Sequence, residues 1–471
     1  MTSPLPDLAP LKALLGPAGW KEAEADIAPF TRDWLNSWGT PPLGVALPAD
    51  TQAVAAVVAF CAENGLSITP QGGNTGLNGA SVLSEGARGI ILSLSRMNRI
   101  LAIDPVDFSV TVEAGVVLAA LHEALEAHEL MLPLHLGAEG SAQIGGLIAT
   151  NAGGSHAMRF GMMEAQVLGL EAVLPDGQVW DGLRALIKDN TGYALRKLFC
   201  GAEGTLGIVT KAVLRLHPRP VTRATALIAL PDLETAVRTG AALRRSTGAF
   251  LFSLEFFGEF GLALLLGHVP GLSRPLETPG PVYLLIELAT SVAGIDLSEL
   301  LEGALAAGFE DGSILDGVVA GSEAQRAALW RLREELPEGQ RREGAQIKHD
   351  VAVPVSRLPD FVARATAAAE AVLPGVRISP FGHLGDGNVH FNLSAPAGSD
   401  DFSGRNAALS EAVYGAALDF GGTFSAEHGL GQAKIALADR LRAPAERTLM
   451  RRIKHAFDPR GTLNPGKVVR D

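Results

Sequence analysis

The sequence predicts an α+β protein with two domains of different architecture. Short strand patterns alternate with helix patterns from the start of the chain to about residue 220, which is typical of a domain with parallel strand pairs. Beyond Val221 we expect an antiparallel sheet with helices on one face. The length of 471 residues accommodates two or three domains with sizeable cores.

The first domain is expected to begin with a short helical lead-in over residues 1 to about 40. Val45 to Pro48 has the pattern of a strand. Thr51 to Asn64 has apolar residues at helical spacing, with Thr51 as the predicted N-cap. Ser67 to Pro70 is predicted as a short strand that leads into a glycine-rich segment. The domain is expected to span residues 1–220, with a core at about 42–217.

The second domain is expected to span residues 221–424. Tyr283 to Ala289 is predicted as a strand, and helices are predicted around Ala324 to Leu336 and Leu358 to Leu373. Between these helices the polar stretch Pro337 to Gly344 is predicted as a mobile loop. Residues 425–471 form a last segment, and its turn-rich end is expected to fold back onto the first domain.

Composition excludes several classes of protein. The formal net charge is -12 and no basic stripe is visible, so a nucleic-acid binder is disfavoured. The two cysteines, Cys61 and Cys200, are expected to be free thiols in a reducing compartment. No secretory signal pattern and no apolar run of about 20 residues occurs, so no membrane span is expected and the predicted location is cytoplasmic.

Four segments carry a high density of glycine, which lets a backbone approach a ligand closely. Each could be a tight turn, but several together favour backbone N–H groups that line an anion site suited to a pyrophosphate. They match neither the dinucleotide fingerprint G-x-G-x-x-G nor the phosphate loop G-x-x-x-x-G-K-[ST]. The sequence therefore favours a nucleotide cofactor held by another fold. The segments are Pro70–Ser81, Gly137–Gly161, Cys200–Thr210 and Pro380–Asn392.

In these segments the chain resembles the PCMH-type FAD-binding domain of the vanillyl-alcohol oxidase superfamily. It is most similar to the branch of D-2-hydroxyglutarate, D-lactate and glycolate dehydrogenases, from about Pro42 to Lys467. The resemblance implies an FAD-binding domain followed by a substrate-binding cap of the FAD-linked oxidase C-terminal type. It implies FAD contacts from Pro70, Gln71, Gly72, Gly73, Asn74, Thr75, Gly76, Ser81, Pro133, Gly137, Ser141, Ile144, Gly145, Gly146, Asn151, Ala152, Gly153, Gly154, Gly204, Gly207, Ile208, Val209 and Asn464.

The first glycine-rich loop also bears on how FAD is held. Relatives that bond FAD covalently use a histidine, often in this loop, or a cysteine. Here the loop reads Gly-Gly-Asn-Thr, so we expect FAD to be bound without a covalent link. The nearby His156 is interpreted as a packing residue or as part of a substrate entrance.

His383 and His390 stand seven positions apart in GHLGDGNVH, where the glycines and a turn dipeptide predict two strands joined by a tight bend. Glu427 and His428 occur together in SAEHGLG. These histidines could be ordinary turn residues, but two imidazoles and one carboxylate also form a common ligand set for a divalent ion. A 2-hydroxy acid could chelate such an ion, with His428 as the general base and the flavin as hydride acceptor.

The family resemblance implies further roles. It implies that His383, His390 and Glu427 bind zinc and that His428 is the base, while Asn388 contacts substrate. Arg333 and Lys348 resemble the cations that bind the substrate carboxylate. Relatives that act on hydroxyglutarate commonly carry a threonine four residues after the arginine, where this chain has Pro337, so D-lactate or another D-2-hydroxy acid stays open.

The expected activity is FAD-dependent oxidation of a D-2-hydroxy acid to the 2-oxo acid, with a substrate like D-2-hydroxyglutarate or like D-lactate. The alternatives are the FAD subunit of a glycolate oxidase, an FAD-binding subunit without catalysis and a metal-binding hydrolase. No nicotinamide site or cysteine cluster for an iron–sulfur centre is visible, so electrons are expected to pass to an external carrier such as a quinone or an electron-transfer flavoprotein. The oligomeric state stays open, a homodimer included.

Overall fold

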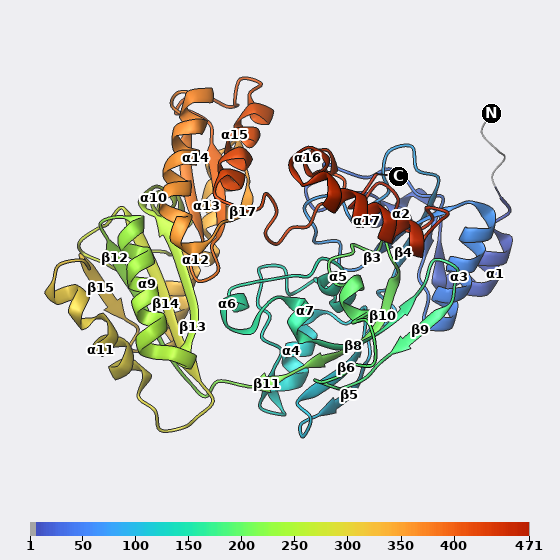
Figure 1. The fold of residues 1–471 in the computed structure, drawn as a ribbon, viewed down its shortest axis with the longest axis horizontal. Coiled ribbons are helices and arrows are strands. Elements are labelled where there is room, and N and C mark those ends of the chain that lie inside the picture. The colour runs from blue at the N-terminus through green and yellow to red at the C-terminus, as the bar shows by residue number, and fades with distance from the viewer. Residues whose placement is uncertain (1–5, 471) are drawn as a thin grey trace. The chain divides into compact units, whose positions relative to one another are not determined.

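The computed structural model describes residues 6–470 (Figure 1). Contacts divide the chain into two compact units. The first unit contains the chain up to Gly154, then Gly161–Pro218, and finally the residues from Glu427 onward. The second unit contains Ser155–Phe160 and Arg219–Ala426.

The first unit begins with a four-stranded sheet of strand order β1-β2-β4-β3. Strands β2 and β3 both run parallel to β4, as the sequence predicted for this domain, whereas β1 is antiparallel to β2. The elements of this part are α1 (Ala9–Gly19), β1 (Trp20–Lys21), α2 (Glu24–Thr31), β2 (Val45–Ala46), α3 (Thr51–Asn64), β3 (Ser67–Gln71) and β4 (Gly89–Ser93).

Helix α3 has the predicted bounds but a different cap. Asp50 is the N-cap, and its side chain accepts a hydrogen bond from the Ala53 N–H. Thr51, the predicted N-cap, is instead the first helical residue, and its hydroxyl lies 2.5 Å from Glu171 Oε1 in the core. Gly65 ends the helix in the left-handed conformation, at φ 63°.

The second sheet of the first unit was not predicted. Its five strands have the order β5-β6-β10-β8-β9 and are antiparallel throughout, so parallel pairing is confined to the first sheet. Strand β8 is buried along its whole length, because side chains from both of its faces enter hydrophobic cores. The strands are β5 (Ile100–Asp104), β6 (Ser109–Glu113), β8 (Val167–Val173), β9 (Val179–Gly182) and β10 (Ile208–Arg215).

Short helices and a small strand pair complete the first half of the chain. Strand β7 pairs with β11 antiparallel, and helix α6 belongs to the second unit. The elements are α4 (Leu118–Glu126), β7 (Leu130–Met131), α5 (Ile144–Ala149), α6 (Ala157–Phe160), α7 (Met163–Gln166), α8 (Arg196–Phe199) and β11 (His217–Pro218).

The second unit is built on an eight-stranded sheet in which the paired strands are antiparallel, as predicted. The path is β15-β12-β14-β13-β18-β19-β16, and β17 pairs with β19 beside it. The strands are β12 (Thr222–Leu230), β13 (Leu251–Gly258), β14 (Val282–Thr290), β15 (Asp316–Val319), β16 (Gln346–Ile347), β17 (Asp350–Ala352), β18 (Arg377–His383) and β19 (Asn388–Ser394).

Helices cover both faces of this sheet, so the prediction of one covered face was wrong. Ala226 and Ile228 of β12 enter one core, whereas Leu227 and Ala229 of the same strand enter another. A strand buried on both faces reads as a continuous apolar run, and ATALIAL has that pattern. The helices are α9 (Leu233–Thr247), α10 (Glu259–His268), α11 (Leu297–Glu310), α12 (Glu323–Glu334), α13 (Leu336–Glu343), α14 (Leu358–Val372) and α15 (Asn406–Asp419).

Helix α13 replaces the mobile loop that was predicted over Pro337–Gly344. The proline lies in the first turn of the helix, where its missing N–H costs nothing. Glu338 forms ion pairs with Arg341 and Arg342, at the spacings that join neighbouring turns. A Cβ on Gly339 would stand 2.7 Å from the Leu265 Cα, so this glycine allows α13 to pack closely on α10.

The C-terminal segment contains α16 (Ile435–Leu441) and α17 (Pro444–Phe457) and then contacts strand β3 of the first unit. Leu463 forms a parallel bridge with Ile68, and Ile68 exchanges backbone hydrogen bonds with Thr462 and Asn464. The polar and turn-rich end of the chain is therefore held by strand pairing.

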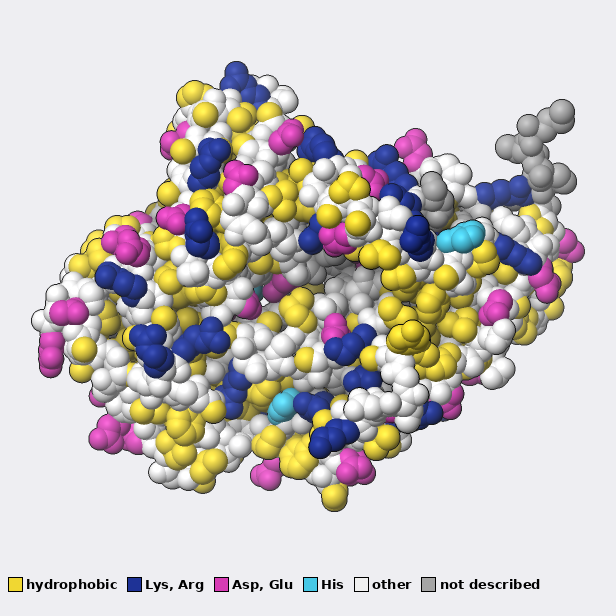
Figure 2. All heavy atoms as spheres, viewed as in Figure 1, with side chains coloured by type: hydrophobic (Ala, Val, Ile, Leu, Met, Phe, Trp, Pro, Cys, Tyr) yellow, Lys and Arg dark blue, Asp and Glu magenta, His cyan; other side chains and the backbone are white. Residues whose placement is uncertain are grey.

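The drawn surface carries charges of both signs, and the cysteines are free. On the face drawn in Figure 2, Lys and Arg side chains are interspersed with Asp and Glu. Cys61 and Cys200 are free thiols, and burial raises the pKa of each to about 12. Among residues 6–470, no helix combines the length and the apolar character that crossing a bilayer requires.

Candidate active site

The first two glycine-rich segments of the first unit lie side by side. A Cβ on Gly73 would stand 1.8 Å from the Ser141 carbonyl oxygen, so only glycine allows this approach. A Cβ on Gly72 would make ordinary contact with Gln143 at 3.5 Å. The backbones of the two loops therefore form one continuous surface.

Polar side chains of the first loop hold the shape of the loop itself. Gln71 Nε2 donates to the backbone carbonyls of Phe30 and Ser81. Asn74 has a positive φ of 52°, and its Oδ1 accepts a 2.7 Å hydrogen bond from the Ser81 hydroxyl. These side chains were expected to contact FAD, and the hydrogen bonds that the structure shows for them hold the loop in its conformation.

Several predicted FAD residues can offer only backbone, because their side chains lie in hydrophobic cores. These residues are Ile144, Ala152, Ile208 and Val209. Pro133 is buried as well, whereas Thr75 is half-buried and Gly137 and Ser141 are exposed. Asn151 has a φ of 50°, and its Oδ1 accepts from the Glu164 N–H.

The glycines of the first unit serve two purposes. Some permit close packing: Gly145 lies against Ala114, Gly204 against Pro70, Gly207 against Phe199, and Gly154 against the carbonyl of His135. Others face open space, because a Cβ at Gly76, Gly137 or Gly146 would meet no described atom within 4 Å. The second group is the part of the surface on which a bulky cofactor can lie.

Two buried polar atoms near these loops have no hydrogen-bond partner among the described residues, Gln143 Oε1 and Asn464 Oδ1. The amide nitrogen of Asn464 donates to the carbonyls of Ala80 and Glu203, which fixes the side chain in place. Buried acceptors normally have a donor. A ligand with N–H or O–H donors, as FAD has, would satisfy them, so the residues present fit this cofactor.

The loop that carries Glu427 and His428 is anchored within the first unit. Asn78 Nδ2 donates to the His428 carbonyl at 3.0 Å. Glu203, which is buried, accepts from the backbone N–H groups of Leu430 and Gly431 at 2.7 and 2.8 Å. Burial raises the pKa of Glu203, although these two N–H groups oppose the shift.

Glu427 lies against the second glycine-rich segment. A Cβ on Gly153 would stand 3.3 Å from Glu427 Oε1. Asn78 and Glu203 were missed as supports of this loop at the sequence level. The only local signal was their position inside the glycine-rich segments PQGGNTGLNGAS and CGAEGTLGIVT.

In the second unit, His383 and His390 occupy the predicted hairpin. His383 ends β18 and pairs with Asn388 at the start of β19, while His390 pairs with Phe381. The two histidines are therefore diagonal neighbours on adjacent strands. Their ring centroids lie 5.8 Å apart, and candidate ligand nitrogens of the two rings lie within 4.8 Å of each other.

A buried carboxylate that the sequence did not reveal contacts this histidine pair. Glu255 of β13 stands opposite His383 in the sheet, and its Oε1 lies 2.8 Å from His383 Nδ1. Its Oε2 accepts a 2.9 Å hydrogen bond from Arg333 Nε. Burial acts to raise the pKa of Glu255, but its interactions with His383 and Arg333 outweigh burial and hold that pKa below the usual value.

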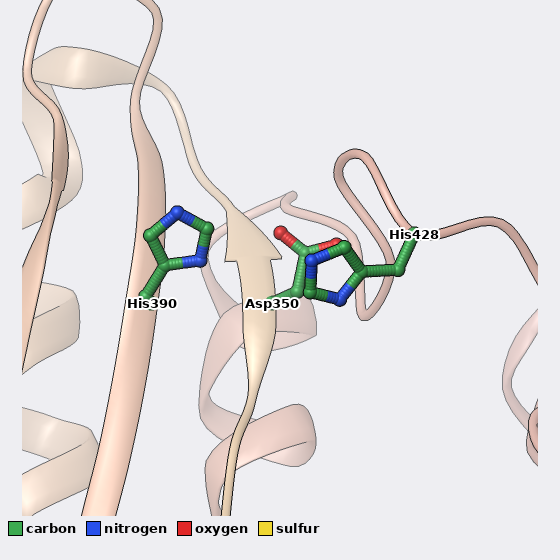
Figure 3. A group of neighbouring side chains, drawn as sticks. All are labelled: Asp350, His390 and His428. Atoms are coloured by element: carbon green, nitrogen blue, oxygen red, sulfur yellow. The ribbon is translucent and has the colours of Figure 1, made fainter. Parts of the chain in front are cut away.

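Asp350 is a second carboxylate that was missed. It stands opposite His390 on β17, and ligand atoms of the two side chains lie within 4.8 Å of each other (Figure 3). Its Oδ2 accepts a 3.0 Å hydrogen bond from the Ala426 N–H. Ala426 is the last residue of the second unit and directly precedes Glu427 and His428 in the chain.

The predicted substrate residues have different surroundings. Asn388 Nδ2 donates to Asp350 and to the Val351 carbonyl, while its buried Oδ1 has no hydrogen-bond partner among the described residues. Arg333 is buried and lies over the Phe381 ring, 5.0 Å from its centroid. Lys348 is exposed between β16 and β17, and desolvation by its neighbours, with the charge of Arg341 second, lowers its pKa.

Comparison with known proteins identifies the class. Residues 42–182 match the family described as FAD binding domain, and residues 219–468 match FAD linked oxidases, C-terminal domain. The chain is thus an FAD-dependent oxidoreductase. It is 38% identical to D-2-hydroxyglutarate dehydrogenase of Xanthomonas citri pv. viticola, over 95% of this chain and 93% of the relative. It is also 38% identical to the mitochondrial enzyme of Bos taurus, over 94% of this chain and 80% of the relative.

The chain belongs to the family of FAD-linked dehydrogenases that contains the D-2-hydroxyglutarate dehydrogenases. A crystal structure of p-cresol methylhydroxylase with bound substrate superposes with a TM-score of 0.69 at 18% identity, over 98% of this chain and 95% of that one. The PCMH-type fold and the FAD cofactor that the sequence predicted are therefore confirmed.

Proposed function

We propose that this protein oxidises a D-2-hydroxy acid to the 2-oxo acid, with the substrate bound to a divalent metal held by His383, His390 and Glu427. The observation that carries the proposal is the pair of imidazoles on the β18–β19 hairpin, whose candidate ligand nitrogens lie within 4.8 Å of each other. Two imidazoles and a carboxylate suit zinc and leave positions for a substrate. In this proposal residues 1–220 hold FAD, residues 221–424 bind substrate and residues 425–471 return to the FAD-binding part.

Different residues of the chain have separate roles in the proposed reaction. When bound, the metal would polarise the α-hydroxyl of the substrate, and FAD would accept the α-hydrogen as hydride. His428 takes the hydroxyl proton, because a ring nitrogen of a neutral imidazole can accept it and the hydrogen bond from Asn78 fixes the backbone of this residue. Asn388 offers its unpaired Oδ1 to a donor of the substrate.

The preferred substrate is inferred to be D-2-hydroxyglutarate or a close dicarboxylic analogue. The names of the relatives support this choice, and so does Arg333, whose fork of Nη1 and Nη2 suits a second carboxylate. One observation favours a smaller acid such as D-lactate. Pro337 lies in the first turn of α13, at the position where the family resemblance leads us to expect a threonine, so one hydrogen-bond donor to a distal carboxylate is missing.

Anaerobic bleaching of the flavin spectrum tests the proposal. D-2-hydroxyglutarate, D-malate, D-lactate and glycolate would be compared, with the L-isomers of the chiral acids as controls. We expect rapid bleaching by the D-acids, fastest with D-2-hydroxyglutarate, loss of bleaching after chelation and recovery with Zn²⁺. Bleaching that survives complete removal of metal would refute the metal-bound substrate, and bleaching by none of the acids would refute the oxidation itself.

We further propose that an external carrier, a quinone or an electron-transfer flavoprotein, reoxidises the flavin. The proposal is supported by the cysteine content, because two cysteines, Cys61 and Cys200, are too few to hold a four-cysteine iron–sulfur cluster. Stopped-flow mixing of reduced enzyme with a quinone analogue, with an electron-transfer flavoprotein and with oxygen would measure each rate. Reoxidation fastest by oxygen would count against a carrier.

A further inference from the structure

We infer that Glu255 is a positioning residue that joins the metal site to the substrate-carboxylate site through the two oxygens of one carboxylate. The inference rests on the proposed function, since it assigns Glu255 a task toward the proposed ligand His383 and the proposed substrate residue Arg333. Both contacts lie within the second unit. Glu255 was not among the residues that the sequence singled out.

The geometry is specified by the sheet. Strand β13 pairs with β18 so that Glu255 stands opposite His383, and the next pair on the same face is Phe257 opposite Phe381. Arg333 lies in the last turn of α12, and its guanidinium lies over the Phe381 ring. The register of β13 against β18 thus places the Phe381 ring, the Glu255 carboxylate and the His383 imidazole close together, and Arg333 contacts the first two.

Each oxygen of Glu255 has one cationic or proton-bearing partner. Oε1 lies 2.8 Å from His383 Nδ1, and Oε2 lies 2.9 Å from Arg333 Nε. The carboxylate accepts both hydrogen bonds, which requires His383 to carry a proton on Nδ1. Nε2 is then the nitrogen that can bind a metal, and a carboxylate behind a metal-bound imidazole both orients the ring and strengthens the ligand.

The same carboxylate orients Arg333. Its hydrogen bond uses Nε, so the planar fork of Nη1 and Nη2 remains for the carboxylate of a substrate. Glu255 is only 1% exposed, so the loss of either partner would leave one oxygen of a buried carboxylate without a hydrogen bond. Displacement of either proposed site is therefore transmitted to the other.

The substitution Glu255→Gln tests this arrangement because an amide cannot accept two hydrogen bonds with separate oxygens. One end of the amide must present an N–H₂ group. The oxygen should stay with the permanently charged Arg333, because charge-assisted hydrogen bonds are the stronger ones. The N–H₂ group then faces His383 Nδ1, which moves the ring proton to Nε2 and blocks the metal-binding nitrogen.

The experiment measures Zn²⁺ affinity by competition with a chromophoric chelator on the FAD-loaded protein. We expect Glu255→Gln to raise the Zn²⁺ dissociation constant about 10- to 100-fold, the usual effect of losing such a partner. FAD content and the circular dichroism spectrum together serve as the folding checks. If Glu255→Gln does not retain FAD, Glu255→Asp is measured instead, since a carboxylate shortened by one methylene cannot span both partners.

The matched control is Glu287→Gln. Glu287 is also buried on a strand of this sheet, and it binds Arg223, Arg326 and the Trp330 ring N–H but no proposed ligand. Weakened zinc binding in Glu255→Gln alone supports the inference. Unchanged zinc binding in Glu255→Gln, or an equal loss in Glu287→Gln, overturns it while the proposed metal site stands. If the unaltered protein binds no Zn²⁺, the proposed function fails at its metal, and the inference falls with it.

A kinetic measurement separates positioning from simple loss of metal. At saturating Zn²⁺, Glu255→Asp should raise KM for D-2-hydroxyglutarate more than KM for D-lactate, because only the former has a distal carboxylate for Arg333. A general structural defect would raise both equally, and that outcome would overturn the link between the two sites.

Discussion

Asn78 donates from Nδ2 to the backbone carbonyls of His428 at 3.0 Å and Gly429 at 2.7 Å. A residue of the first glycine-rich segment, which is proposed to contact FAD, therefore holds the loop of the proposed base. The two residues are 350 positions apart in the chain. In the proposed function, one segment of the first unit thus positions both the flavin and the base.

The substitution Asn78→Ala is predicted to slow flavin reduction by substrate about 10-fold or more, with FAD still bound. Two hydrogen bonds are lost, and a small displacement of a reacting group has large kinetic effects. Stopped-flow absorbance under anaerobic conditions measures the rate. Asn64→Ala is the control, because Asn64 is exposed and donates to the Phe60 carbonyl of its own helix. Equal rates of flavin reduction in Asn78→Ala and in the unaltered protein would show that Asn78 does not position the base.

The substitution His428→Ala is predicted to lower the rate of flavin reduction by about 10²- to 10⁴-fold, the usual contribution of a general base. The flavin spectrum should stay unchanged, because the loop is held through its backbone and through Glu203. The exposed His455 supplies a control in His455→Ala. Full activity in His428→Ala would assign the base elsewhere or leave the protein as a flavin carrier without catalysis.

The parts of the site that could be predicted are those encoded within short stretches. His383 and His390 share one hairpin, and the residues GDGN between them predict the turn. Helix α3 was predictable because its apolar spacing and its glycine stop are local. The contact of Glu255 with His383 spans 128 residues and depends on strand register, which no local pattern specifies.

Other differences between the sequence predictions and the structure also arise from contacts between distant parts of the chain. Polar PEGQRREG looks like a loop, yet its glycine faces a helix backbone and its charges pair along a helix. Asp350 lies two residues after Lys348 in the sequence. Its position opposite His390 depends on the pairing of β17 with β19, which the local sequence does not specify. The antiparallel sheet of the first unit was missed because the direction of strand pairing is a tertiary property, and the alternating pattern alone suggested parallel pairs.

Packing of α13 on α10 predicts that Gly339→Ala destabilises the protein by about 1–3 kcal/mol, because an added methyl group meets the backbone at Leu265. Chemical denaturation followed by fluorescence measures the loss. Gly415→Ala is the control within helix α15, since a Cβ there meets no described atom within 4 Å and alanine favours helix by up to about 1 kcal/mol. If both variants behave alike, α13 does not pack as described.

The last prediction concerns the pH dependence of stability at Lys467, a buried residue whose ammonium donates to Ser84 Oγ at 2.7 Å. Burial lowers the pKa of Lys467 to about 7, and the negative charge of Glu203 opposes the shift. An unfolded lysine has a pKa of about 10.4. Between these two values the unfolded chain holds a proton that the folded protein has released, so stability rises with pH.

Lys467 should raise the free energy of unfolding by up to about 1.4 kcal/mol per pH unit above pH 7. This contribution should vanish below pH 7, where the folded and unfolded states both carry the proton. Lys467→Met removes the titration, so the stability of the unaltered protein relative to Lys467→Met should grow between pH 7 and 9. Equilibrium denaturation at several pH values measures both curves. Lys188→Met, at an exposed lysine, should leave the slope unchanged. Parallel curves for Lys467→Met and the unaltered protein would show that this ammonium titrates as an ordinary surface lysine does.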